Sequence, residues 1–309
     1  MKKKILVIYY SQSGQLRDIL DNIVYDIQHK VDIDFVQIEP VQPFPFPWTA
    51  TEFFDAMPET VQLIPSPIQP LPVEIMNTPY DLVLFGYQSW FLSPSQPATS
   101  FLKSQYAAIL KDKPVVTVIG CRNMWLNGQE KVKEMLLDVG AKLVGNIVLT
   151  DKNPNLISIL TIMRWSFKGQ KAASGILPEA GVQSADIKNA QRFGMQIHKH
   201  LAEGRLDVLH KELLLQGAIH LKPGLIILEK RGVKNFAKFA KYIREKGGPG
   251  DPNRRGRVKL FQWLLTIAVF ILSPISSLTA AIQLQLQKKG LLRDVEYFKG
   301  LKLEKDMLK

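Results

Sequence analysis

A short loop with two hydroxyl groups and a glycine, Ser11-Gln12-Ser13-Gly14, follows the first apolar run of the chain and precedes a helical pattern. Glycine permits backbone conformations that other residues avoid, and the first amides of a helix have no partner within the helix. With the helix dipole, such a loop can bind a phosphate group without a lysine, or it can be an ordinary helix cap. Neither GxxxxGK[ST] nor GxGxxG follows this run, which disfavours a nucleoside triphosphatase and a Rossmann dinucleotide site.

Two further loops, Gly86–Pro94 and Cys121–Trp125, combine flat aromatic side chains with amide and hydroxyl groups, and each follows an apolar run. If those runs are parallel strands, their carboxyl ends meet at one edge of a sheet, where ligands bind. A planar heterocycle could stack on these aromatic rings and receive hydrogen bonds from their neighbours. Three such loops in succession favour a flavin over a chance collection of surface aromatics.

The elements that position these loops alternate between strand and helix. Short apolar runs predict five strands, at Lys4–Tyr10, Ile33–Ile38, Tyr80–Gly86, Pro114–Gly120 and Lys142–Leu149. Helical spacing of apolar residues predicts helices at Leu16–Ile27, Pro97–Leu110, Gln129–Val139 and Ser184–Gly204. The alternation predicts an α/β fold, a doubly wound parallel five-stranded sheet with helices on both faces and its ligand at the carboxyl ends of the strands.

A proline-rich insertion, residues 40–79, interrupts this alternation. It has nine prolines between Pro40 and Pro72, and because proline removes a donor and fixes φ, we expect an extended excursion rather than sheet. Its aromatic residues either pack against the domain edge or a subunit partner, or form a wall of the substrate pocket. They are Phe44, Phe46, Trp48, Phe53 and Phe54.

Composition and cysteine content narrow the class of protein. The chain has 309 residues, 46% hydrophobic and 22% charged, which are globular values. Its single cysteine, Cys121, rules out an intrachain disulfide and favours a reducing, cytoplasmic compartment. We interpret Cys121 as a small apolar residue at a strand end rather than as a nucleophile. His198 and His200 are two apart on a helix and do not share a face, so we expect no metal site.

The last third of the chain carries nearly all of the excess charge. Residues 1–206 hold 20 Lys+Arg and 19 Asp+Glu, whereas residues 207–309 hold 20 and 9. We therefore predict one domain at 1–206 and a basic, helical region at 207–309. In that region a cationic amphipathic helix at Val233–Arg244 and a Gly/Pro break precede residues 260–287, which contain no charge. This segment could span or lie on the inner face of the cytoplasmic membrane, pack as a buried helix pair, or form a nucleic-acid arm, which we disfavour.

The motifs YYSQSGQL, GYQSWFLSPSQPATSFL and GCRNMW together resemble the flavodoxin-like FMN-binding superfamily, with its (S/T)xSGxT phosphate loop and its PxWxxxxPxxxxF segment at the flavin ring. The resemblance covers about the first 205 residues. It implies that the FMN phosphate is held by Ser11, Gln12, Ser13, Gly14, Gln15 and Leu16, that the ring is lined by Gln88, Ser89, Trp90, Phe91 and Leu92, and that Cys121, Arg122 and Asn123 approach from the other side. Two features depart from the pattern: Leu16 replaces the usual threonine, and the chain lacks the acidic character of an electron-carrying flavodoxin.

Within that superfamily the chain is most similar to the dialkylresorcinol condensing enzyme family, found beside aryl-polyene and flexirubin pigment pathways. The likeness lies in the SQSGQL opening, the SWFLSPS loop and the length. It implies an FMN-dependent aromatase that oxidises a lipophilic dialkylcyclohexanedione to a dialkylresorcinol, beside a ketosynthase partner. An NAD(P)H-dependent quinone or FMN reductase at the membrane, a non-catalytic electron carrier, and a scaffold for a ketosynthase remain alternatives. The expected partners are therefore a lipophilic substrate, a ketosynthase, an anionic membrane surface and a second copy of the chain. No general base can be assigned, since Tyr87, Ser89 and Arg122 are candidates by location only.

Overall fold

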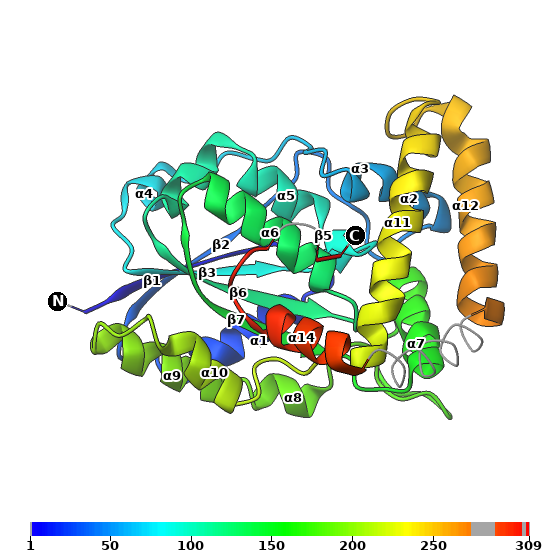
Figure 1. Cartoon of the computed structure of the whole chain (residues 1–309). Helices are drawn as coiled ribbons and strands as arrows, with labels where there is room; N and C mark the ends of the chain where they lie inside the picture. Colours follow the sequence, from blue (N-terminus) through cyan, green and yellow to red (C-terminus); the bar gives the residue numbers. More distant parts are fainter. Residues whose placement is uncertain (1, 273–287, 305–306, 309) are drawn as a thin grey trace.

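The computed structural model describes residues 2–272, 288–304 and 307–308 (Figure 1). The second half of the uncharged segment 260–287 thus lies outside the described residues.

The centre of the protein is a parallel sheet of five strands. In chain order they are β1 (Lys4–Tyr9), β2 (Asp32–Gln37), β3 (Leu82–Tyr87), β6 (Pro114–Cys121) and β7 (Lys142–Thr150). Their order across the sheet is β2-β1-β3-β6-β7, and every neighbouring pair is parallel. This is the flavodoxin-like strand order, which confirms the predicted fold class. The apolar runs form these strands because a parallel sheet is buried on both faces; β3 has no residue outside the core.

Helices cover both faces of the sheet (Figure 1). One face carries α1 (Gln15–Tyr25), α8 (Ser184–Lys188), α9 (Gln191–Ala202) and α10 (Leu209–Leu215), and the other carries α5 (Gln96–Leu102), the 3₁₀ turn η1 (Gln105–Leu110) and α6 (Leu126–Asp138). The single helix predicted over Ser184–Gly204 is two helices, α8 and α9. A further helix, α7 (Asn155–Lys168), was not predicted.

The proline-rich insertion contains three short helices, so the expectation of a wholly extended segment was wrong. They are α2 (Ala50–Asp55), α3 (Met57–Val61) and α4 (Val73–Asn77). A capping box starts α2: the Glu52 amide donates to Thr49 Oγ1 at 3.2 Å, and Glu52 Oε2 accepts from the Thr49 amide. Pro58 lies in the first turn of α3, where proline is tolerated because that amide has no helical partner.

The C-terminal region consists of α11 (Pro223–Arg244), the turn η2 (Pro252–Arg254), α12 (Arg255–Ile267), the π turn η3 (Ala268–Leu272) and α14 (Lys288–Lys299). Side chains from this region, among them Ile226, Leu291 and Phe298, belong to the same buried cluster as the strands. Figure 1 shows α11 and α12 side by side at the end of the sheet where the strands finish. Within the described ranges, none of the helices is both long and apolar enough to cross a bilayer. Whether residues 1–206 form a separate domain stays a prediction.

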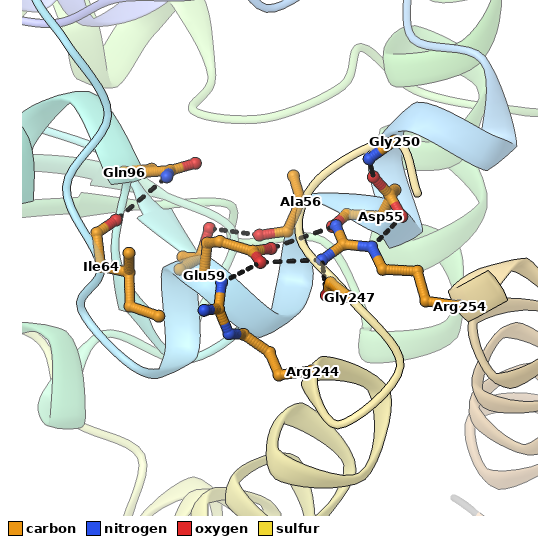
Figure 2. A network of polar contacts seen from close by, with 10 residues as sticks. Asp55, Ala56, Glu59, Ile64, Gln96, Arg244, Gly247, Gly250 and Arg254 are labelled. Atoms are coloured by element: carbon orange, nitrogen blue, oxygen red, sulfur yellow. Dashed lines mark hydrogen bonds and ion pairs between the residues drawn. The ribbon is translucent and has the colours of Figure 1, made fainter. Parts of the chain in front are cut away.

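A buried ion network fastens the α11–α12 pair to the insertion (Figure 2). The Arg254 side chain is fully buried and lies 2.7 Å from Asp55 Oδ1 and 2.8 Å from Glu59 Oε1. Arg244 contacts the same Glu59 oxygen at 2.7 Å, and the Gly250 amide donates to Asp55. Glu59 is only 2% exposed, so these two arginines, rather than water, compensate its negative charge. We call this network the Arg254 latch.

Candidate functional site

The predicted phosphate loop lies between β1 and the start of α1. Gly14 occupies the N-cap position with a φ of 83° and has no side chain to cap the helix, while Ser11 Oγ accepts the Arg17 amide at 3.4 Å. A Cβ added to Gly14 would have no atom within 4 Å, so the surroundings are open and the positive φ is what favours glycine. The loop therefore places the amino end of an eleven-residue helix, which has a glycine at its N-cap and one long contact from Ser11, at the end of β1, which is an anion-binding arrangement.

Two residues of the predicted phosphate set turn their side chains inward. The buried Gln15 amide exchanges two hydrogen bonds with the Val182 backbone, each 3.0 Å long. Leu16 is 1% exposed and packs beneath Gly86 and Gly120. Both side chains hold α1 against the rest of the fold. They could therefore contact a phosphate only through their backbone amides, and the missing threonine hydroxyl at Leu16 is replaced by core packing.

A hydrogen bond joins the predicted phosphate loop, residues 11–16, to the loop predicted to lie at the flavin ring, residues 86–94, which we call the ring loop. The Gln12 amide donates to Gln88 Oε1 at 3.1 Å, and Gln12 Nε2 donates to the Pro45 carbonyl at 2.9 Å. Since β1 and β3 are neighbours, these contacts unite the two loops and the insertion at one point of the sheet edge. That point is the β1/β3 switch point, where flavodoxin-like folds bind their ligand.

The ring loop contains a tight hairpin, β4 (Ser89–Trp90) and β5 (Ser93–Pro94), with Phe91 and Leu92 at its tip. Both tip residues have positive φ, 48° and 62°, a conformation that favours glycine or asparagine in such turns. Strain of this kind costs about 1–3 kcal/mol per residue and persists only when packing fixes it. Here Asn127 Nδ2 donates to the Leu92 carbonyl at 2.7 Å, and the Phe91 ring lies 4.8 Å from that of Phe53.

Three aromatic rings surround Trp90 edge-on. The ring centroids of Phe44, Trp48 and Tyr10 lie 5.1, 5.5 and 5.8 Å from that of Trp90, at interplanar angles of 75–82°. Such T-shaped pairs are favourable for aromatic rings. The insertion thus packs on this domain's own ring loop.

The third loop, Cys121-Arg122-Asn123, converges on α7. Arg122 Nη1 and Asn123 Nδ2 donate to Asn155 Oδ1 at 2.8 and 3.1 Å. The Asn123 Oδ1 atom is buried and has no hydrogen-bond partner among the described residues, and the same is true of Ser89 Oγ. Burial raises the pKa of the Cys121 thiol, so the thiol stays protonated. Burial also lowers the pKa of Arg122, opposed by the charge of Asp151.

A buried carboxyl group from the C-terminal region, Glu229 of α11, reaches the start of α6. It is 1% exposed, and Glu229 Oε1 accepts the Asn127 amide at 2.9 Å. Burial raises the pKa of Glu229 to about 7, although backbone amides at Asn127, Leu126 and Trp125 act in the opposite direction. Glu229, Asn123, Asp151 and Leu126 line a cavity of about 530 Å³.

Sequence reasoning missed Glu229 and Asn155 for different reasons. The predicted amphipathic helix began at Val233, whereas α11 begins at Pro223, so Glu229 fell outside it. Asn155 starts the unpredicted α7. A proline at 223 in a basic, apolar stretch, followed by one isolated acid, was the available signal.

The predicted site residues are distributed over more than one hollow. Asn123 lines the cavity with Glu229, whereas Phe91 and Leu92 line a second cavity of about 480 Å³ beside α11. Residues 11–16 line neither of these two. Of the predicted set, the structure therefore joins Gln12 to Gln88 directly and places Cys121–Asn123 on a neighbouring strand end.

Several solved structures are distantly similar to this chain. No family model matches the chain, and no curated protein matches it. Among solved structures, a flavoprotein from Lactobacillus acidophilus in complex with FMN is 20% identical with a TM-score of 0.38, and the match covers 47% of this chain and 93% of that one. A WrbA-like flavodoxin from Agrobacterium tumefaciens is 11% identical with a TM-score of 0.35, covering 65% and 99%. Because these TM-scores are below 0.5, we base no argument on them.

Proposed function

We propose that this protein is an FMN-dependent oxidoreductase. The observation that carries the proposal is the Gln12–Gln88 hydrogen bond, which joins a glycine-capped helix start to an aromatic hairpin at the β1/β3 switch point. Flavodoxin-like folds with this strand order bind FMN there. The residues fit the group: the start of α1 suits its phosphate, and two buried oxygens, unpaired among the described residues, suit a heterocycle. The Ser89 hydroxyl could donate or accept a hydrogen bond there, and Asn123 Oδ1 could accept one.

The residues of the chain would hold and orient rather than perform difficult chemistry. Converting a cyclohexane-1,3-dione to a resorcinol removes two electrons and two protons from the ring, and FMN supplies the hydride acceptor when bound. The proton between two carbonyls is acidic, so a weak base is sufficient. Tyr87 does not fit that role, because its hydroxyl is buried, donates to Gln129 at 2.7 Å, and has its pKa raised well above 10 by burial. The Glu229 carboxyl can hold a proton near neutral pH on the Asn123 side.

We further propose a lipophilic dialkylcyclohexanedione as the substrate and a dialkylresorcinol as the product, in aryl-lipid or pigment biosynthesis beside a ketosynthase. The sequence resemblance supplies this substrate class. An apolar region between the hairpin and α11 supports it. There the centroid of the Phe91 ring lies 4.8 Å from that of Phe53 and 6.2 Å from that of Phe236.

The test is the visible absorbance spectrum of the purified protein, followed by anaerobic addition of a dialkylcyclohexanedione. Flavin bands that bleach, with resorcinol appearing, are the expected result. Flavin bands that persist until NAD(P)H is added would contradict the aromatase proposal and favour an NAD(P)H-dependent reductase. Absence of flavin after incubation with FMN would refute both and leave the scaffold.

The phosphate-loop assignment has its own test in Ser13→Asp. This change puts a negative charge beside the predicted phosphate position, so we expect FMN retention to fall by at least about tenfold. Ser13→Asn, which has the same shape without the charge, is the matched control and should retain more FMN. Equal flavin content in the two variants and the wild type, measured after gel filtration, would refute the assignment.

A further inference from the structure

We propose that the exposed face of α12 is a docking surface for a bilayer with anionic headgroups, on which the helix lies without crossing. This docking face consists of Leu260, Trp263 and Leu264 of α12 and of Phe270 and Ile271 in the π turn η3 that continues it, and it is distinct from the proposed flavin site.

The two faces of α12 differ in what covers them. Val258 and Phe261 are buried, at 3% and 2% exposure, against a cluster that includes Phe54 and Ile243. On the docking face, Trp263 is 69% exposed and Ile271 is 62% exposed, with Leu260, Leu264 and Phe270 at 37–45%. Leu260, Trp263 and Leu264 lie on one side of α12, because positions three and four apart share a helix face, and Phe270 and Ile271 follow in η3. Five large exposed apolar side chains between residues 260 and 271 are more than scattered surface hydrophobics.

The charges around this face select the occupant. Residues 223–272 contain eleven Lys+Arg and three Asp+Glu, a balance of +8. Four lysines are exposed, namely Lys234, Lys238 and Lys241 of α11 and Lys259 of α12. Arg254 is not among these exposed charges, because it is buried and paired with Asp55 and Glu59 in the Arg254 latch. An apolar stripe with flanking lysines is the pattern of helices that lie in the membrane interface, and each basic residue near an anionic surface adds attraction. A second copy of this chain would instead bring its own lysines against these, which is unfavourable.

The docking face is held in a fixed orientation. The Arg254 latch ties the loop between α11 and α12 to Asp55 and Glu59, and the Phe261 ring packs on Phe54 at 6.0 Å. α12 and η3 together have eighteen residues, from Arg255 to Leu272, about 27 Å at the rise of an α-helix, which is shorter than the hydrocarbon core of a bilayer. A short, rigidly mounted helix suits contact parallel to the surface, with Trp263 at the headgroup level where tryptophan is enriched.

The face also lies near the proposed site. Phe261 contacts Phe236 of α11 at 5.6 Å, and Phe236 contacts Phe91 of the strained hairpin at 6.2 Å. Docking through α12 would therefore bring the end of the sheet that carries the hairpin close to the lipid, which suits a substrate that partitions into it.

The experiment is sedimentation of the full-length protein with vesicles of phosphatidylcholine, with and without phosphatidylglycerol. We expect binding that requires phosphatidylglycerol and weakens with salt. Trp263→Glu should reduce the partition coefficient at least about tenfold, and Lys238→Glu with Lys259→Glu should do the same. The matched control is Leu137→Glu on α6, since Leu137 is 67% exposed, and it should stay within about twofold of wild type.

Lipids with brominated acyl chains give a second readout, because they quench an inserted tryptophan. Trp48, Trp125 and Trp165 are at most 8% exposed, and Trp90 is partly buried among three aromatic rings, so most of the quenching should be lost in Trp263→Phe. Failure to bind anionic vesicles, equal binding by Trp263→Glu and wild type, or a dimer that Trp263→Glu converts to a monomer would each overturn the proposal. None of these measurements needs flavin or substrate, so their outcome is separate from that of the proposed function.

Discussion

The buried Glu229 carboxyl predicts a specific dependence of stability on pH. Its pKa rises from the usual 4.5 to about 7 on folding, chiefly because burial disfavours the charged form. Between these values the folded chain keeps a proton that the unfolded chain releases, so stability falls as pH rises through this window. At about 1.4 kcal/mol per pKa unit, the contribution lost by neutral pH is about 3 kcal/mol. This contribution to the free energy of unfolding is fully present below about pH 4.5 and is lost above about pH 7.

Glu229→Gln isolates this contribution, because glutamine cannot ionise and can still accept the Asn127 amide. The free energy of unfolding from urea denaturation, followed by circular dichroism, should change less with pH in the variant. The difference between variant and wild type should grow by about 3 kcal/mol from about pH 4.5 to pH 7.5. Glu134→Gln on α6, where the side chain is 46% exposed, should leave the pH dependence within about 0.5 kcal/mol of wild type. Parallel pH profiles for Glu229→Gln and wild type would show that folding does not raise the pKa of Glu229, and the reasoning from burial would be refuted.

Two further changes test how the fold is held. Arg254→Met leaves the buried Glu59 with one arginine, and we expect a loss of about 3–5 kcal/mol in unfolding free energy; the exposed Arg255→Met should cost less than about 0.5 kcal/mol, and equal urea midpoints for the two would contradict the latch. Gly194→Ala would place a methyl group 1.7 Å from the Ile23 carbonyl, so α9 must move from α1 at a cost of about 3 kcal/mol or more. Gly224→Ala in α11, where nothing lies within 4 Å, should be neutral or stabilising by up to about 1 kcal/mol, and a Gly194→Ala protein as stable as this control would disprove the close approach.

The sheet could be predicted from the sequence because its signal is local. A strand buried on both faces must be apolar along its length, as Leu82–Tyr87 is, and such runs are visible without knowing their neighbours. The start of α1 was visible for a similar reason, since a glycine and two serines adjoin the helical pattern. Helix α7 was not, because Leu156, Leu160 and Met163 are exposed although apolar, so its apolar residues are not confined to one face.

The contacts that shape the site could not be read from local patterns. Gln15 meets Val182 across 167 positions, and Arg254 meets Glu59 across 195. The residues near Gln15 and Arg254 in the sequence do not indicate these partners. A glutamine after Ser-Gly, for example, is equally consistent with a phosphate ligand. The carboxyl of Glu229 is likewise buried against a helix that begins about a hundred residues earlier in the chain; burial raises its pKa, and the amides of that helix oppose the rise.

The Arg254 latch also imposes an order on events during synthesis. A chain grows from its amino end, and domains begin to fold as they emerge. Asp55 and Glu59 are therefore made long before Arg244 and Arg254 leave the ribosome. Until then the carboxylate of Glu59 and the ring of Phe54 stay exposed to water and to other chains. Residues 244–254, which are made late, complete the packing of the insertion, so a chain shortened before residue 244 should aggregate through this uncovered surface instead of remaining as a smaller soluble protein.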